Sequence, residues 1–173
     1  ICYGVQQGFL SQEGASSGRE QILIYDLGGG TFDVTVMEID GTSYRAIATA
    51  GDVYLGGVDW DERLGDHIAE AFVAEHGLDP RRDEIGNQAL LLKAGEAKHS
   101  LTSRESVTLF FNYDGRRLKM DISRAEFEEM TSDLLDRTMM TVRQVLREAQ
   151  LEFSQLTRLL LVGGSTRMPA VQR

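Results

Sequence analysis

The chain has 173 residues, of which 42% are hydrophobic, and a formal net charge of −9 at pH 7. That length and apolar content suffice for a sizeable core, in one domain or in two small ones. The acidic charge argues against a nucleic-acid partner, because binding to a phosphate backbone needs clusters of Lys and Arg. The single cysteine, Cys2, excludes an internal disulfide. No long apolar run and no signal-peptide pattern is present, so the sequence predicts a soluble, cytoplasmic protein with no membrane partner.

Residues 1–20 are predicted to form the end of a preceding helix and a loop. Residues 1–5 are apolar, and Gly4 and Gly8 interrupt that pattern. Residues 11–18 are small and polar, which is typical of loops. Because the sequence starts at Ile1 and not at a methionine, we expect it to be part of a longer protein.

The segment from Asp26 to Asp33 reads Asp-Leu-Gly-Gly-Gly-Thr-Phe-Asp and follows the apolar run from Ile22 to Tyr25, in a strand expected to start at Gln21. With a second apolar run over 32–39, the pattern predicts two strands joined by a tight turn. Three consecutive glycines permit positive φ angles and leave no side chains in the way. Their N–H groups can therefore surround a bulky anion such as phosphate.

Two carboxylates, those of Asp26 and Asp33, flank this turn, with the hydroxyl of Thr31 between them. Carboxylates repel phosphate unless a cation lies between them, and Mg²⁺ is normally held by one or two carboxylates, waters and substrate phosphates. A plain glycine-rich hairpin with solvated acids is the alternative. The flanking acids and the strand pattern favour a site for a metal and a nucleotide.

The next part of the chain predicts a third strand and two helices. Asp40-Gly41 is a hairpin signal, and alternating apolar residues over 44–49 complete a meander of three strands. A helix of about five turns is expected from Asp59 to Gly77, on the apolar spacing of Trp60, Leu64, Ile68 and Phe72. After a loop at 79–82, a second helix is expected over 89–101.

The last third predicts a hairpin, one long helix and a final strand. Asp114-Gly115 joins strands expected over 106–113 and 116–122. Ser123 and Glu126 form a capping box that opens a helix reaching Ala149. The apolar run at 158–162 predicts a central strand that is covered on both faces.

A second glycine turn follows that strand, in the order Gly163-Gly164-Ser165-Thr166-Arg167. By itself it is equally compatible with a plain strand-to-helix turn before Pro169. Two such turns in one chain suggest a ligand shared between them, because neighbouring strands present their ends to the same edge of a sheet.

Three motifs, at 26–33, 51–59 and 161–169, resemble the ATPase domain of the seventy-kilodalton heat-shock chaperones, the DnaK-type proteins. The resemblance implies an α/β fold, namely one lobe of an actin-like ATPase (ribonuclease H-like) with an inserted α+β subdomain. The inner nucleotide-binding subdomain would comprise 21–57 and 136–173. The inserted outer subdomain would comprise 58–135.

The resemblance also assigns roles to individual residues. Asp26, Thr31 and Asp33 would be catalytic: Asp26 orders Mg²⁺ and K⁺, and Asp33 with Thr31 assists a second cation and the attacking water. The β- and γ-phosphates would bind to Gly28, Gly29, Gly30 and Thr31. The adenosine would be held by Gly163, Gly164, Ser165 and Arg167. The residues of the ribose- and adenine-contacting helix would be Lys98, His99 and Thr102.

This helix departs from the family pattern at two positions. Gly95 stands where the family normally has a glutamate for the ribose hydroxyls, and Glu96 lies about 100° further round the helix. His99 stands where an arginine often stacks on adenine, and a solvated His99 is the other interpretation.

For the intact protein, the resemblance implies ATP and ADP as ligands and slow ATP hydrolysis that switches peptide binding for protein folding. The first ATPase lobe and the peptide-binding domain would be partners, as would a J-domain co-chaperone and a nucleotide exchange factor. Because the first lobe supplies the catalytic lysine in the family, we expect the isolated chain to bind nucleotide weakly and not to hydrolyse it. The alternatives are a small-molecule kinase of the sugar-kinase type and a non-catalytic actin-like scaffold. Retention of the two aspartates and Thr31 argues against the scaffold.

Overall fold

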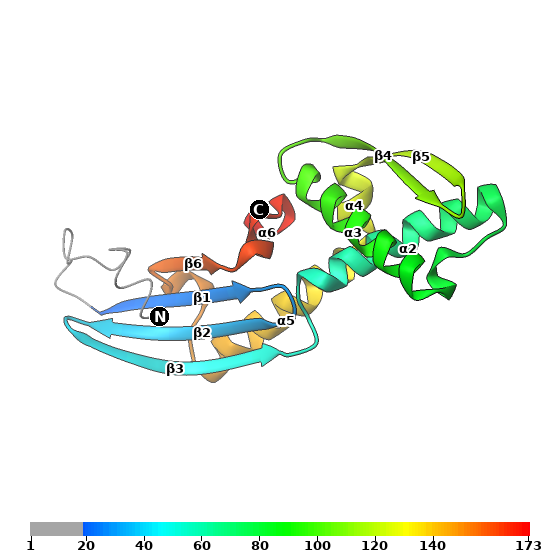
Figure 1. Ribbon diagram of the computed structural model, residues 1–173. Helices are drawn as coiled ribbons and strands as arrows, with labels where there is room; N and C mark the ends of the chain where they lie inside the picture. The colour runs from blue at the N-terminus through cyan, green and yellow to red at the C-terminus, as the bar shows by residue number, and fades with distance from the viewer. Residues whose placement is uncertain (1–18) are drawn as a thin grey trace.

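The computed structural model describes residues 19–173, so the helix end and loop expected before residue 19 lie outside the described residues. Figure 1 shows two parts joined side by side: a sheet with one long helix, and a group of helices with a hairpin. Within residues 19–173, no helix is long and apolar enough to cross a membrane.

The sheet has four strands in the order β3-β2-β1-β6. Their bounds are Glu20–Leu27 for β1, Phe32–Asp40 for β2, Ser43–Asp52 for β3 and Arg158–Val162 for β6. The first three strands form the predicted antiparallel meander, and β6 joins β1 in parallel. The ends of β1 and β6 therefore lie at the same edge of the sheet, as predicted from the two glycine turns.

The strand β6 is not central in the described sheet. The sequence predicts cover on both faces, but β6 is at the edge of this sheet and the Leu159 side chain is 61% exposed. A short apolar run has the same appearance in a buried strand and in an edge strand, because its composition does not say what lies beside it.

The second part contains α2 (Gly57–His76), α3 (Glu84–Leu101) and α4 (Arg124–Met130), with the hairpin of β4 (Ser106–Tyr113) and β5 (Arg116–Ser123). The helix α2 ends at Gly77, which has a φ of 70°. The helix α3 starts earlier than expected, because the Asp83 carboxylate caps it by accepting a hydrogen bond from Gly86 N. Asp114 and Gly115 both have positive φ, as in the predicted tight hairpin.

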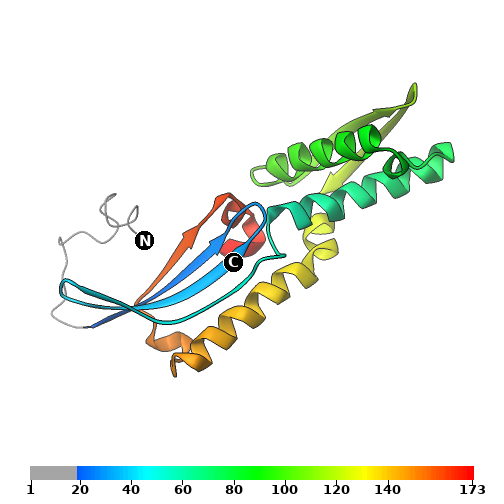
Figure 2. The same ribbon diagram turned by 60° about the horizontal axis from the view of Figure 1, so that its bottom comes forward.

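The long helix expected after Ser123 is two helices. The capping box of Ser123 and Glu126 opens α4, and α5 (Ser132–Glu148) starts after a break at Thr131. The Thr131 hydroxyl donates to Phe127 O at 2.8 Å, which is the bond to a carbonyl one turn back that bends helices. Arg63 of α2 donates to Met130 O at 3.2 Å and so binds the free end of α4. Figure 2 shows α5 running along one face of the sheet.

The base of the first glycine turn is buried. Leu27 and Phe32, the residues at the two strand ends, are completely buried. The predicted apolar stripe of α2 is also buried, at Trp60, Leu64, Ile68 and Phe72.

Short helical turns complete the chain: η1 (Pro80–Arg82), η2 (Phe153–Gln155), η3 (Gly164–Arg167) and α6 (Pro169–Gln172).

Candidate functional site

The first glycine turn is fixed by the start of α2. Gly28 N donates to Thr31 O at 3.0 Å and closes the turn. Gly57 N donates to Gly28 O at 2.9 Å, and Val58 N donates to Gly29 O at 2.8 Å. The first N–H groups of a helix have no partner within it, and here two of them anchor the turn.

The three glycines of this turn are not needed for positive φ. None of Gly28, Gly29 and Gly30 has a positive φ, so the turn does not use the left-handed conformation that glycine permits. A Cβ atom placed on Gly29 or Gly30 would meet no atom within 4 Å. Since neither strain nor crowding within residues 19–173 demands glycine at 29 and 30, the space above their backbone is open to a ligand.

The two glycine turns lie against each other. Ser165 Oγ donates to Gly28 O at 2.9 Å. Gly163 has a φ of 90°, and a Cβ atom there would collide with Leu27 O and lie 3.0 Å from Asp26 Oδ1. Only glycine fits at 163, and this close approach places the second turn beside Asp26. The predicted juxtaposition of the two turns is confirmed.

The two predicted metal ligands are cross-strand partners. Asp26 on β1 is directly opposite Asp33 on β2, so both side chains are on one face of the sheet. Like charges directly opposite each other destabilise a sheet, and a cation between them removes that repulsion. Within residues 19–173, no group of three or more metal-binding side chains gathers at one point. A pair of carboxylates nevertheless fits Mg²⁺, which takes most of its ligands from water and phosphate.

The connection from β3 to α2 is held by Asp52. Its carboxylate accepts hydrogen bonds from Tyr54 N at 2.9 Å and from Arg137 of α5 at 2.6 Å. The Tyr54 N–H and then Arg137 hold the pKa of Asp52 below its usual range, although burial opposes them. This contact fixes the loop that delivers Gly56 and Gly57 to the first glycine turn.

Lys98 lies where the two turns and α2 meet. Its Nζ donates to Gly57 O at 2.6 Å and lies 2.8 Å from Asp61 Oδ1. A Cβ atom on Gly57 would be 3.3 Å from this Nζ and would collide with Ser165 Oγ. The structure therefore brings Lys98 together with Ser165 and the first turn.

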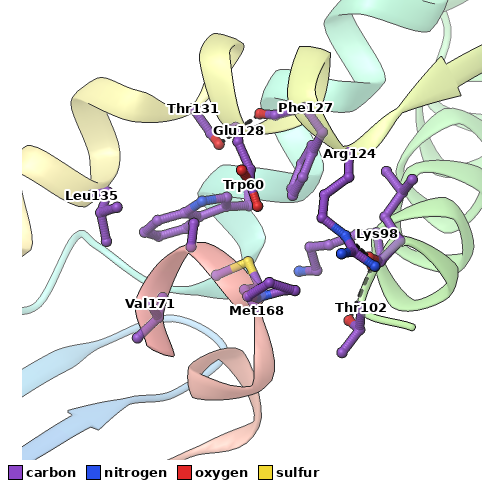
Figure 3. A pocket seen from close by; sticks show the side chains of 13 residues that line it. Trp60, Lys98, Thr102, Arg124, Phe127, Glu128, Thr131, Leu135, Met168 and Val171 are labelled. Carbon is purple, nitrogen blue, oxygen red and sulfur yellow. Dashed lines mark hydrogen bonds between the residues drawn. The ribbon is translucent and has the colours of Figure 1, made fainter. Parts of the chain in front are cut away.

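Thr102 lies one turn of α3 beyond Lys98, and its hydroxyl donates to Lys98 O at 3.3 Å. Both residues line a cavity of about 20 Å³, roughly the space of one water, between α3, α4 and α6. Figure 3 shows Trp60 and Met168 on the other side of this cavity. It is too small for a nucleobase, so a base would have to lie outside it.

The remaining predicted contacts are at the surface. His99, Gly164 and Arg167 are exposed. Among the described residues, the side chains of His99 and Arg167 make no hydrogen bond or ion pair, so both are free to turn toward a ligand. The Glu96 carboxylate pairs with Lys93 at 2.5 Å and does not occupy the space beside Gly95.

Sequence reasoning gave no site role to Gly56, Gly57 and Asp61. A Cβ atom on Gly56 would lie 2.5 Å from the backbone of Gly30, so this glycine permits the close packing of α2 on the turn. A glycine pair just before the acidic start of a helix could have indicated such a contact. Asp61 gave no signal, because a single acid on an acidic helix is usually solvated.

Known proteins are similar in sequence to this chain over most of its length. The family model described as Hsp70 protein matches residues 1–173. Chaperone protein DnaK of Deinococcus deserti is 44% identical over 164 residues, which are 90% of this chain and 26% of that protein. Heat shock cognate 70 kDa protein 3 of Dictyostelium discoideum is 40% identical over 179 residues, covering 100% of this chain and 27% of that protein.

The fold is one lobe of an actin-like ATPase, as the sequence predicts. The chain belongs to the Hsp70 family. It spans about a quarter of the length of these curated relatives. The subdomain boundaries and the roles of individual site residues stay predictions.

Proposed function

We propose that this chain is the nucleotide-binding lobe of a chaperone ATPase, whose slow ATP hydrolysis switches peptide binding for protein folding. The observation that carries the proposal is the contact between the two glycine turns, made by Ser165 Oγ and Gly28 O, beside the paired carboxylates of Asp26 and Asp33. The printed names of the relatives, Chaperone protein DnaK and Heat shock cognate 70 kDa protein, support it.

Different groups of residues contact the phosphates, the cations and the adenosine. The open backbone of Gly28, Gly29 and Gly30, with Thr31, binds the phosphates through N–H groups. Asp26 would order Mg²⁺ and K⁺, and Asp33 with Thr31 would assist the second cation and the attacking water. A bound Mg²⁺ supplies charge neutralisation at the phosphates. The adenosine is held by Gly163, Gly164, Ser165, Arg167, Lys98, His99 and Thr102.

The intact protein needs further parts for this cycle. The first ATPase lobe supplies the remaining phosphate contacts. ATP hydrolysis then switches peptide binding in a separate peptide-binding domain. A J-domain co-chaperone and a nucleotide exchange factor act on the same cycle, in the cytoplasm. These assignments come from the resemblance and are proposals for this protein.

Nucleotide binding is tested by calorimetric titration of the chain with ADP and ATP, with and without Mg²⁺. The control is Gly164→Trp, because Gly164 is exposed and a Cβ atom there would meet no atom within 4 Å. The variant should therefore fold and yet block the site. We expect saturable binding that the control loses. No binding at millimolar nucleotide would contradict a site carried by this lobe alone.

Hydrolysis is tested separately. The isolated chain should show no turnover of ATP, because phosphoryl transfer depends on charges around the γ-phosphate that this lobe supplies only in part. Mg²⁺-dependent turnover by the isolated chain that Asp33→Ala abolishes would contradict the need for a first lobe. The longer protein should hydrolyse ATP and lose that activity with Asp33→Ala.

A further inference from the structure

We propose that Asp61 is a positioning residue for nucleotide binding, because it holds the Lys98 ammonium at the junction of the two glycine turns. The inference rests on the proposed function, since it concerns how the same site takes its ligand. It assigns a role to a residue that neither the motifs nor the resemblance singles out.

The pair joins two helices at a partly buried point. Asp61 is on the second turn of α2 and Lys98 is near the end of α3, and Nζ lies 2.8 Å from Oδ1. The side chains are only 14% exposed for Lys98 and 21% exposed for Asp61. Charges in such a place are screened less than surface charges, so their contact sets the direction of the lysine.

At least one donor of Lys98 is left for a ligand. An ammonium carries three N–H donors. Gly57 O accepts one at 2.6 Å, whereas Asp61 Oδ1, which lies 2.8 Å from Nζ, forms an ion pair with the lysine but makes no hydrogen bond. Among residues 19–173, the structure gives Lys98 Nζ no third partner. The free donor lies beside Gly57, next to Ser165 Oγ and Gly28 O, which is where an acceptor oxygen of a bound nucleotide would pass.

Asp61 is the group that keeps the lysine there. Without the carboxylate, a single carbonyl would have to hold a long side chain against the entropy of its free rotamers. Within residues 19–173, no other carboxylate forms an ion pair with Lys98. A Cβ atom on Gly95 would make ordinary van der Waals contact with Asp61 Oδ1, at 3.6 Å, so α3 packs beside this carboxylate.

The test is a double-mutant cycle on ADP affinity with Asp61→Asn, Lys98→Met and both together, measured by calorimetry. Asp61→Asn keeps the size of the side chain and removes the charge. We expect each single variant to weaken ADP binding about tenfold, the worth of one charged hydrogen bond. The double variant should bind no more weakly than Lys98→Met alone, because Asp61 acts through Lys98. Fully additive losses would overturn the proposal.

A matched control is Asp66→Asn on the same helix, whose carboxylate pairs with Arg81 at 2.9 Å. It removes one acidic charge from α2 away from the glycine turns. We expect no change in ADP affinity. A loss equal to that of Asp61→Asn would show a general effect of helix charge and would overturn the positioning role.

A second measurement, the chemical reactivity of Lys98, does not depend on determining an affinity for ADP. Lys98 is acylated with an amine-reactive reagent and the extent is read by mass spectrometry. Asp61→Asn should raise the acylation rate several-fold in the ligand-free chain, and ADP should protect Lys98 in the parent chain. An unchanged acylation rate in Asp61→Asn would show that Asp61 does not restrain the Lys98 side chain, and it would overturn the proposal. A raised rate without protection by ADP, and without calorimetric binding, would overturn a nucleotide site carried by this lobe alone and with it the nucleotide role of Asp61.

Discussion

The glycines of the site differ in what the surrounding protein demands of them. Gly56 faces the backbone of Gly30 so closely that any Cβ atom would collide with it. Gly29 faces open space. Glycine is therefore required at 56 by packing and at 29 only by whatever binds there.

This difference predicts opposite phenotypes for two alanine substitutions. Gly29→Ala should leave the free energy of unfolding within about 0.5 kcal/mol of the parent and weaken ADP binding about tenfold. Gly56→Ala should lower the free energy of unfolding by about 2 kcal/mol or more, since backbone must move. Urea unfolding and calorimetry on the two variants measure both effects. Equal loss of stability in the two would contradict an open space above Gly29.

Some residues of the proposed site could be predicted from the sequence around them, and others could not. Asp26, Asp33 and Ser165 stand in motifs whose neighbours along the chain determine the local conformation. The partner of Lys98 is on another helix, and the Gly56 contact depends on how that helix meets the sheet. No local pattern encodes such contacts, because they arise from packing between distant segments.

Among the elements, β1 and α5 are tied together by a buried hydroxyl pair. Tyr25 Oη donates to Thr138 Oγ1 at 2.9 Å, and Thr138 donates onward to Leu135 O at 2.7 Å. Burial raises the pKa of Tyr25 above its ordinary value of 10.0, although the Thr138 contact opposes the shift. The neutral phenol is therefore part of the folded state.

The Tyr25 contact predicts a pH-dependent contribution to stability. Because the pKa is higher in the folded state, the contribution is complete below the unfolded value of about 10 and is lost as the pH rises through the folded value. Tyr25→Phe should cost about 1 kcal/mol at neutral pH, since Thr138 keeps its bond to Leu135. The gap between parent and variant should shrink above about pH 10. Urea unfolding across that range measures it, and a gap independent of pH would argue against a buried phenol.

The elements also show where sequence patterns fail. The Asp40-Gly41 and Asp114-Gly115 hairpins and the capping box at Ser123 are confirmed, because each depends on a few adjacent residues. The break at Thr131 was missed, because the apolar spacing continues through it. The end of α4 before this break is bound by Arg63, which donates to Met130 O from 67 residues away in sequence.

At the scale of the whole molecule, the site lies between the two parts of the chain. The glycine turns belong to the sheet, whereas Lys98 belongs to the part built from α2, α3 and α4. A nucleotide that contacts both should hold them together.

Hydrogen exchange tests whether a bound nucleotide contacts both the sheet and the part built from α2, α3 and α4. ADP at about a hundred times its dissociation constant should stabilise the chain by about 2.7 kcal/mol. Exchange should slow both at the glycine turns and in α3 around Lys98. Protection confined to β1 and β6, with α3 unchanged, would show that the ligand contacts the sheet alone.

The contact between Ser165 and Gly28 joins residues that are 137 positions apart, and this separation governs when the site can exist. The meander of β1, β2 and β3 is continuous in sequence and can form early, whereas its pairing with β6 must close a very long loop. A chain leaving the ribosome from its N-terminus therefore makes the first glycine turn long before the strand β6 that places the second turn beside it. Under the proposed function, nucleotide capture during synthesis has to wait until β6 has emerged and paired with β1, so that only molecules with a closed sheet can take up the ligand.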